Sequence, residues 1–216
     1  MRNAVKAALG ASCAMLLLAC AAVQEERGTQ GARFEFALIG DMPYDTRTEK
    51  EFGNVMREIN AAELAFVVHN GDFWGDGAAW IDKAGPELER ERAPFVFVGG
   101  LPPCSDETFD DRLRLAQSSR HPFILVPGDN EWTDCHRAKP RAHDPLERLT
   151  KLRQVFFAGD RTLGRRTMRV MRQSEDSRYA RFPENMRWSY GNVLFVTLHM
   201  VGSNNNLGRT AEMDAE

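Results

Sequence analysis

Short apolar runs alternate with amphipathic stretches along the chain. The runs at 34–39, 64–68 and 123–127 have the length of buried strands, and each is closed by a polar turn. Apolar residues recur at helical spacing over 48–62 and 145–159, and a further helix is expected to begin at Asp106 or Asp110 and to end near 118. This alternation of strand and helix predicts an α/β fold in which helices cover a sheet.

Further elements are expected between and after these. Residues 78–92 should be helical, and 94–98 should form either a short strand or an apolar loop. Residues 186–199 predict a β-hairpin that turns at Gly191–Asn192. A last helix is expected to begin with Thr210 as its cap. Because little of that helix follows, we expect the chain to be a fragment of a longer protein.

The N-terminus predicts export. Arg2 and Lys6 precede an apolar stretch that is too short and too rich in small residues to span a bilayer comfortably, which is typical of a signal peptide. Its end, Leu-Leu-Ala-Cys, resembles a bacterial lipobox, which implies a lipid anchor at Cys20; ordinary cleavage after an alanine is the alternative. We therefore expect a signal peptide over 1–20, a tether over 21–32, one domain over 33–216, and a periplasmic or membrane-anchored bacterial protein.

Cysteine usage and charge refine this expectation. Once Cys13 and Cys20 are set aside, Cys104 and Cys135 are candidates for one disulfide in an oxidising compartment, with a metal-binding pair as the weaker alternative. The formal net charge of −3 does not favour a nucleic-acid-binding surface. Eight arginines lie between 161 and 187; they are expected either to form a solvated surface connection or to attract an anionic substrate.

The apolar runs end in residues that can bind metal. Three of them close with Gly-Asp, at Asp41, Asp72 and Asp129, and a fourth run, 193–198, ends at His199. If the strands are neighbours in one sheet, three carboxylates and an imidazole converge at one edge, and that much negative charge is tolerable only around cations. The pattern predicts a metal site. His69, by contrast, is expected to be a hydrogen-bonded core residue.

In this order and spacing, the Gly-Asp endings and the late histidine resemble the calcineurin-like metallophosphoesterase superfamily over about residues 33–204. The resemblance implies an αββα sandwich of mixed sheets, possibly incomplete at the C-terminus. It also implies a site for two divalent metal ions, with Mn, Fe, Zn and Mg not distinguished. Asp41 would then bind the first metal, Asp72 would bridge the two, and Asp129 and His199 would bind the second.

The resemblance also assigns the catalytic block. Asn130 stands where the family has a histidine that protonates the leaving group or holds the phosphate, and Glu131 is expected to support the site from behind rather than to bind metal. The family's first block has a histidine where this chain offers Tyr44, and its last block, Gly-His-x-His, is absent. An asparagine can donate a hydrogen bond but cannot act as a general acid.

The expected function is therefore an exported metal-dependent phosphoesterase that hydrolyses phosphomonoesters or phosphodiesters with metal-activated water. The alternative is a catalytically weak or inactive relative that binds metal or a phosphorylated ligand at the cell surface. A third reading is an α/β lipoprotein whose acidic loops bind calcium for stability alone. The expected partner is a phosphorylated small molecule or ester, with membrane contact only through a lipid at Cys20.

Overall fold

The structure is a computed structural model that describes residues 33–44, 46–74, 101–138 and 141–214. The predicted signal peptide and tether, the helix expected at 78–92 and the segment 94–98 lie outside the described residues. Within the part that is described, no helix is both long enough and apolar enough to cross a membrane.

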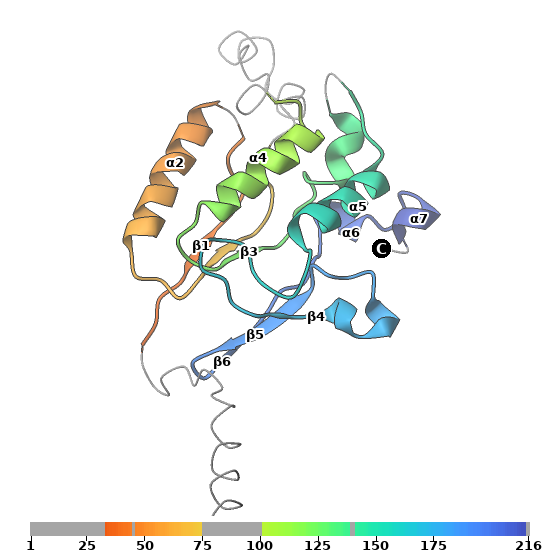
Figure 1. Ribbon diagram of the computed structural model, residues 1–216. Helices are drawn as coiled ribbons and strands as arrows, with labels where there is room; N and C mark the ends of the chain where they lie inside the picture. The colour runs from red at the N-terminus through yellow and green to blue at the C-terminus, as the bar shows by residue number, and fades with distance from the viewer. Residues whose placement is uncertain (1–32, 45, 75–100, 139–140, 215–216) are drawn as a thin grey trace, which may run out of the picture.

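The centre of the fold is a small parallel sheet in the order β1-β2-β3 (Figure 1). Its strands are β1 (Ala37–Ile39), β2 (Val67–His69) and β3 (Phe123–Leu125). Ala37 pairs with Val67, and Val67 pairs with Phe123, so the three strands are in step. Because parallel strands point the same way, the loops that follow them leave from one edge of the sheet.

Three helices pack around this sheet: α2 (Thr46–Ala61), α4 (Asp106–Gln117) and α5 (Pro145–Phe156). The apolar face of α2, with Phe52 and Met56, packs with Val67 and Phe123. Local sequence determines where α4 and α5 begin, since the side chains of Ser105 and Asp144 each accept a backbone N–H of the first turn. The predicted helix bounds are confirmed to within a few residues.

A second, antiparallel sheet has the order β4-β5-β6 and contains the predicted hairpin. Its strands are β4 (Met171–Arg172), β5 (Met186–Tyr190) and β6 (Val193–Val196). The short helices are η2 (Thr133–Arg137), η3 (Gln173–Glu175), η4 (Ser177–Tyr179), α6 (Gly202–Asn205) and α7 (Ala211–Asp214). Thr210 caps α7 as expected, because its hydroxyl accepts the Met213 N–H at 3.1 Å.

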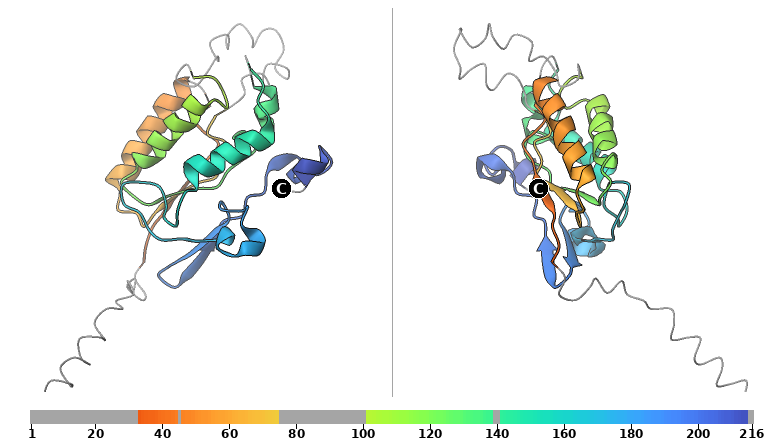
Figure 2. Two further views of the ribbon diagram at one scale, coloured as in Figure 1. Left: turned by 45° about the vertical axis from the view of Figure 1, so that its right-hand side comes forward. Right: turned by 90° about the vertical axis from the view of Figure 1, so that its left-hand side faces the viewer.

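The two sheets face each other through aromatic side chains. Phe66, just before β2, lies edge-on to Trp188 with ring centroids 5.5 Å apart, and 5.0 Å from Phe195. Val67, the next residue, points to the opposite side and packs with α2. One face of the parallel sheet therefore packs against helices and the other against the second sheet (Figure 2). The predicted α/β class is confirmed as a mixed fold with one parallel and one antiparallel sheet.

The arginines between 161 and 187 are used locally rather than gathered in one patch. Arg172 is buried and donates to the carbonyls of Gly159 and Pro183. Arg178 pairs with Asp176 on the surface, and Arg169 pairs with Asp160. These contacts favour a structural connection over a surface that collects anions.

The predicted disulfide is present. Cys104 and Cys135 are bonded, both are buried, and both sulfur atoms lie about 3.5 Å from the carbonyl oxygen of Asn130 (3.6 and 3.5 Å). The metal-binding alternative for this pair is therefore excluded. The bond ties the segment just before α4 to η2, the short helix that follows β3.

We expect a Cys104→Ala, Cys135→Ala variant to lose roughly 3–4 kcal/mol of unfolding free energy, because the bond joins residues 31 positions apart and so restricts the unfolded chain. Urea unfolding of the oxidised wild type and the variant measures this. Reductant should destabilise the wild type and leave the variant unchanged. Equal stability of the two proteins would contradict the prediction.

Candidate metal centre

Three predicted ligands follow the three strands of the parallel sheet. Asp41, Asp72 and Asp129 each come shortly after the C-terminal end of a strand, so the topology brings their loops to one edge. An open hollow at this edge is lined by Asp41, Asp72 and the residues around them. Asp41 is exposed, and the other two aspartates are half-buried.

The loops at this edge touch backbone to backbone. The Asp41 N–H donates to the Gly71 carbonyl at 2.9 Å. A Cβ on Gly71 would lie 2.1 Å from the Gly128 nitrogen, and one on Gly128 would lie 2.0 Å from an Asp72 carboxylate oxygen. Only glycine fits at position 71, where the neighbours are backbone atoms, and a side chain at position 128 would displace the Asp72 carboxylate; this is a physical reason for the Gly-Asp pattern at these two loops.

Asp41 and Asp72 both have left-handed backbone conformations, with φ of 62° and 55°. Such a conformation is uncommon for a residue with a side chain, although aspartate tolerates it better than most. It turns the chain sharply at the end of each strand. Neither carboxylate therefore follows the alternation of side chains between the two faces of its strand. The conformation of the loop determines where each carboxylate lies instead.

Charge is concentrated around Asp72. Burial raises the pKa of Asp72 to about 6, and the nearby charges of Asp129 and Asp41 add to the effect. The Asn130 N–H donates to an Asp72 oxygen at 3.2 Å and opposes this rise. Asp72 thus lies close enough to Asp41 and Asp129 to be repelled by both, and a cation would relieve that repulsion.

Glu131 lies directly behind the aspartates. Its side chain is fully buried; one oxygen accepts the Phe73 N–H at 2.7 Å and the other accepts the Gly128 N–H at 2.6 Å. It therefore clamps the loop after β2 to the loop after β3. Because its carboxylate is occupied and shielded from solvent, we assign Glu131 a positioning role rather than contact with a substrate.

Glu131 makes the stability of the metal-free protein depend on pH. Burial raises its pKa from 4.5 to about 8, so the folded protein holds this proton more tightly than the unfolded chain does. Its stabilising effect is complete below about pH 4.5 and is lost as the pH rises through about 8. We expect the chelator-treated protein to lose about 1 kcal/mol of unfolding free energy between pH 7 and 9.

Urea unfolding at several pH values measures this loss, with Glu131→Gln as the matched variant. That variant cannot titrate here, so its unfolding free energy should be nearly flat over the same range even if it is less stable overall. The pH range of this measurement starts at 7 because burial lowers the pKa of His69 to about 4. Titration of His69 therefore makes the protein more stable as the pH rises from about 4 to 6.5, which is opposite to the effect of Glu131. Parallel pH curves for the two proteins would refute the assignment.

Two side chains support the loop after β1. His69 is buried; its Nε2–H donates to the Met42 carbonyl at 3.0 Å, and its Nδ1 accepts the Gly71 N–H at 3.1 Å, which confirms it as a hydrogen-bonded core histidine. The Tyr44 hydroxyl donates to an Asp41 carboxylate oxygen. Burial, that hydrogen bond and the nearby carboxylates all raise the pKa of Tyr44, so it stays a neutral phenol.

Asn130 is held by hydrogen bonds from both its side chain and its backbone. Its Nδ2 donates to the Trp74 carbonyl at 2.6 Å, and its own N–H donates to Asp72. The side-chain amide is thus oriented by the neighbouring loop. It can donate hydrogen bonds to an anion but has no proton acidic enough to protonate a leaving group.

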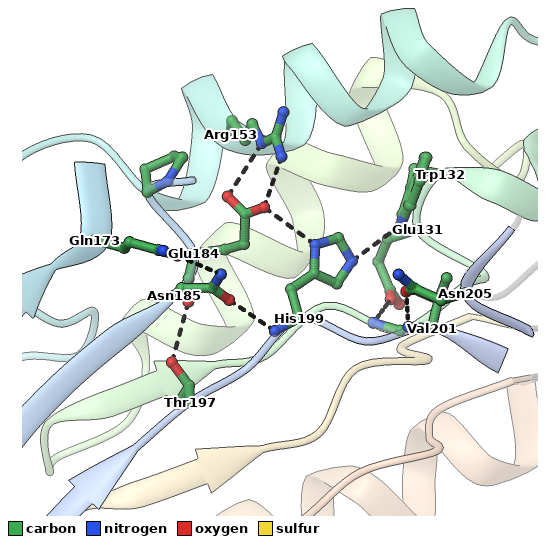
Figure 3. A network of polar contacts seen from close by, with 12 residues as sticks. Glu131, Trp132, Arg153, Gln173, Glu184, Asn185, Thr197, His199, Val201 and Asn205 are labelled. Atoms are coloured by element: carbon green, nitrogen blue, oxygen red, sulfur yellow. Dashed lines mark hydrogen bonds and ion pairs between the residues drawn. The ribbon is translucent and has the colours of Figure 1, made fainter. Parts of the chain in front are cut away.

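His199 belongs to a buried chain of polar groups (Figure 3). Arg153 binds both oxygens of Glu184, at 2.7 and 3.1 Å, and one of these oxygens accepts His199 Nδ1–H at 3.1 Å. The Trp132 indole N–H donates to His199 Nε2 at 3.1 Å. An indole can only donate, so His199 is the neutral tautomer with its proton on Nδ1.

The predicted ligands differ in how well they suit a metal ion. Aspartate oxygens suit hard divalent cations, and a cation would offset the repulsion that Asp41 and Asp129 exert on Asp72. Both ring nitrogens of His199 are already bonded, so it could bind metal only by giving up Trp132. Across the described residues, no three or more His, Cys, Asp or Glu side chains are grouped closely enough to hold a metal ion as they stand.

Several residues of this region were not anticipated from sequence. Glu184 and Arg153 fix His199, and Asn185 Oδ1 accepts its backbone N–H at 2.7 Å. Gly202, at the start of α6, lies against Asp129, since a Cβ there would be 3.0 Å from a carboxylate oxygen. None of these positions stands out in its own stretch of sequence. Comparisons of the chain with protein-family models, with curated proteins and with solved structures find no match.

Proposed function

We propose that this chain is an exported metal-dependent phosphoesterase that hydrolyses phosphomonoesters or phosphodiesters. The observation that carries the proposal is the placement of three aspartates, each following its own strand, at one edge of a parallel sheet, where burial, together with the charges of Asp129 and Asp41, raises the pKa of Asp72. Carboxylates brought to one edge in this way suit a site for divalent cations. Export rests on the signal-like residues 1–20.

The residues divide into three roles in this proposal. Asp41, Asp72 and Asp129 would hold two divalent cations, with Asp72 between them. When bound, divalent cations supply Lewis acidity: they neutralise phosphate charge and lower the pKa of water. Asn130 would orient the phosphate through its amide, and Glu131 keeps the loops at their spacing. His199 remains a predicted ligand that would exchange Trp132 for the metal.

Metal titration of the full chain tests the proposal. Calorimetry with Mn²⁺ after chelator treatment should detect about two sites per chain, as a dinuclear centre requires. The loaded protein should hydrolyse bis(p-nitrophenyl) phosphate, and chelator should stop the reaction. A protein that binds no transition metal would contradict the proposal.

The second candidate is a non-catalytic protein that binds metal or a phosphorylated ligand. It is favoured by Asn130 in place of a general acid and by the bonded state of His199. Metal binding without hydrolysis of either a phosphomonoester or a phosphodiester would select it. Stabilisation by Ca²⁺ with no special effect of Mn²⁺ would select a purely structural calcium site.

A further inference from the structure

The loop that carries Asp72 is held by an arginine from one of the helices that pack around the parallel sheet. Arg112 lies in the middle of α4, and its side chain is 3% exposed. Its Nε–H donates to the Phe73 carbonyl at 3.0 Å, and Phe73 directly follows Asp72. Among the described residues, no other side chain donates to this carbonyl. One buried hydrogen bond thus connects α4 to the candidate metal centre.

Phe73 is bonded at both of its backbone polar groups. Its N–H donates to one oxygen of Glu131 at 2.7 Å, and its carbonyl accepts the bond from Arg112. The other oxygen of Glu131 accepts the Gly128 N–H. Arg112 therefore extends the clamp that Glu131 forms. The series of bonds runs from α4 to the loop after β2, and from there to the loop after β3.

The positive charge of Arg112 is balanced by carboxylates outside the candidate metal centre. Its Nη1 lies 2.6 Å from an Asp111 oxygen and 3.6 Å from a Glu49 oxygen. Burial lowers the pKa of Arg112, and the charges of Asp111 and Glu49 oppose that effect. With these two carboxylates beside it, the guanidinium does not need the aspartates of the centre as counter-ions. What it supplies to the loop after β2 is the Nε hydrogen bond.

The backbone at Asp72 depends on such bonds. Its left-handed φ of 55° is uncommon for a residue with a side chain, and conformations of this kind persist only where the surrounding structure holds them. Phe73 is 4% exposed, so its carbonyl would be buried without a partner if the bond from Arg112 were lost. The loop would relieve this cost by moving, and the spacing between Asp72 and Asp129 would change with it.

We propose that Arg112 is a positioning residue for the candidate metal centre, and that its bond to the Phe73 carbonyl holds Asp72 at the spacing from Asp129 that metal binding requires. The inference rests on the proposed function, since it assigns both aspartates to one metal site. Residues that hold metal ligands in place without touching the metal typically change its affinity by about 10- to 100-fold when they are replaced. Arg112 therefore acts on the affinity for metal.

Two substitutions of similar length separate the hydrogen bond from the charge. Arg112→Met leaves no donor, whereas Arg112→Gln also removes the charge but keeps an N–H donor at the position of Nε. Calorimetric titration of the full chain with Mn²⁺, after chelator treatment, should show an affinity at least about tenfold weaker for Arg112→Met and within about threefold of the wild type for Arg112→Gln. Arg114→Met is the matched control, because exposed Arg114 pairs with the same Asp111 and should leave the affinity unchanged.

Urea unfolding of the chelator-treated proteins ensures that affinities are compared between folded chains. Both Arg112 variants lose the ion pairs of the guanidinium, so a purely structural role would weaken metal binding by both alike, and that result would overturn the proposal. Wild-type affinity in Arg112→Met would also overturn it and would leave the proposed function intact. If Arg112→Met does not fold, Arg112→Gln decides alone, because a tenfold weaker affinity there contradicts the role of the hydrogen bond. A wild type that binds no Mn²⁺ would overturn the proposed function and this inference together.

Discussion

On the proposed function, replacing Asp72 with asparagine is expected to lower phosphodiester hydrolysis by on the order of 1,000-fold and to remove at least one of the two proposed metal sites. The change keeps the oxygen that accepts the Asn130 N–H, so the loop itself should survive. It removes the charge that interacts with both Asp41 and Asp129. Calorimetric titration with Mn²⁺ and the rate with bis(p-nitrophenyl) phosphate measure the two effects.

The stability of the same variant separates a binding role from a structural one. Without metal, Asp72→Asn relieves repulsion, so the chelator-treated variant should be no less stable than the wild type at pH 8. With Mn²⁺ the wild type should gain stability that the variant lacks. Asp110→Asn, an exposed change on α4, is the control and should alter neither property. Wild-type metal binding by Asp72→Asn would refute the assigned role.

Replacing Glu184 with alanine is expected to cost about 3–5 kcal/mol of unfolding free energy, whether or not metal is present. Glu184 is 1% exposed and is held by Arg153 and His199, whose side chains are 16% and 7% exposed. Burial disfavours its charge, but the bonds from His199 and Arg153 outweigh this and hold its pKa below the ordinary value. Removing the carboxylate would leave a buried guanidinium without its main counter-charge.

Urea unfolding at pH 7 measures this loss. Glu184→Gln keeps the volume and some hydrogen bonds, so it should fall between the wild type and Glu184→Ala. Asp176→Ala breaks the exposed pair with Arg178 and should have little effect, because surface pairs are screened by water. A loss for Glu184→Ala no larger than that for Asp176→Ala would contradict the buried role of this carboxylate.

The elements that sequence predicted well are those whose cause is local. Asp144 before Pro145 determines the start of α5, and the Gly191–Asn192 turn determines the hairpin, because the chemistry lies within a few residues. The Gly-Asp endings could be recognised although part of their cause is not local. The backbone of the loop after β3 approaches Gly71 so closely that no side chain fits there, and this restricts the residue type at that position to glycine.

The parts that could not be predicted depend on contacts between distant residues. The bond from Trp132 to His199 joins residues 67 positions apart, and Glu184 lies in a polar stretch that resembles ordinary surface. The resemblance assigned His199 a free nitrogen for metal, whereas both nitrogens are bonded in the folded chain. The three strands of the parallel sheet were expected to be longer than the three residues that pair in each. An apolar run does not show where the hydrogen bonding between neighbouring strands ends.

The clamp formed by Glu131 also has a consequence for local motion. The Phe73 and Gly128 amides share one buried carboxylate, so neither can reach solvent unless that carboxylate gives up a bond. Hydrogen exchange at these two amides should therefore proceed through one shared opening, although they are 55 residues apart in the chain. The loops that carry Asp72 and Asp129 would then open and close as one cooperative unit, and occupation of one should slow exchange in the other.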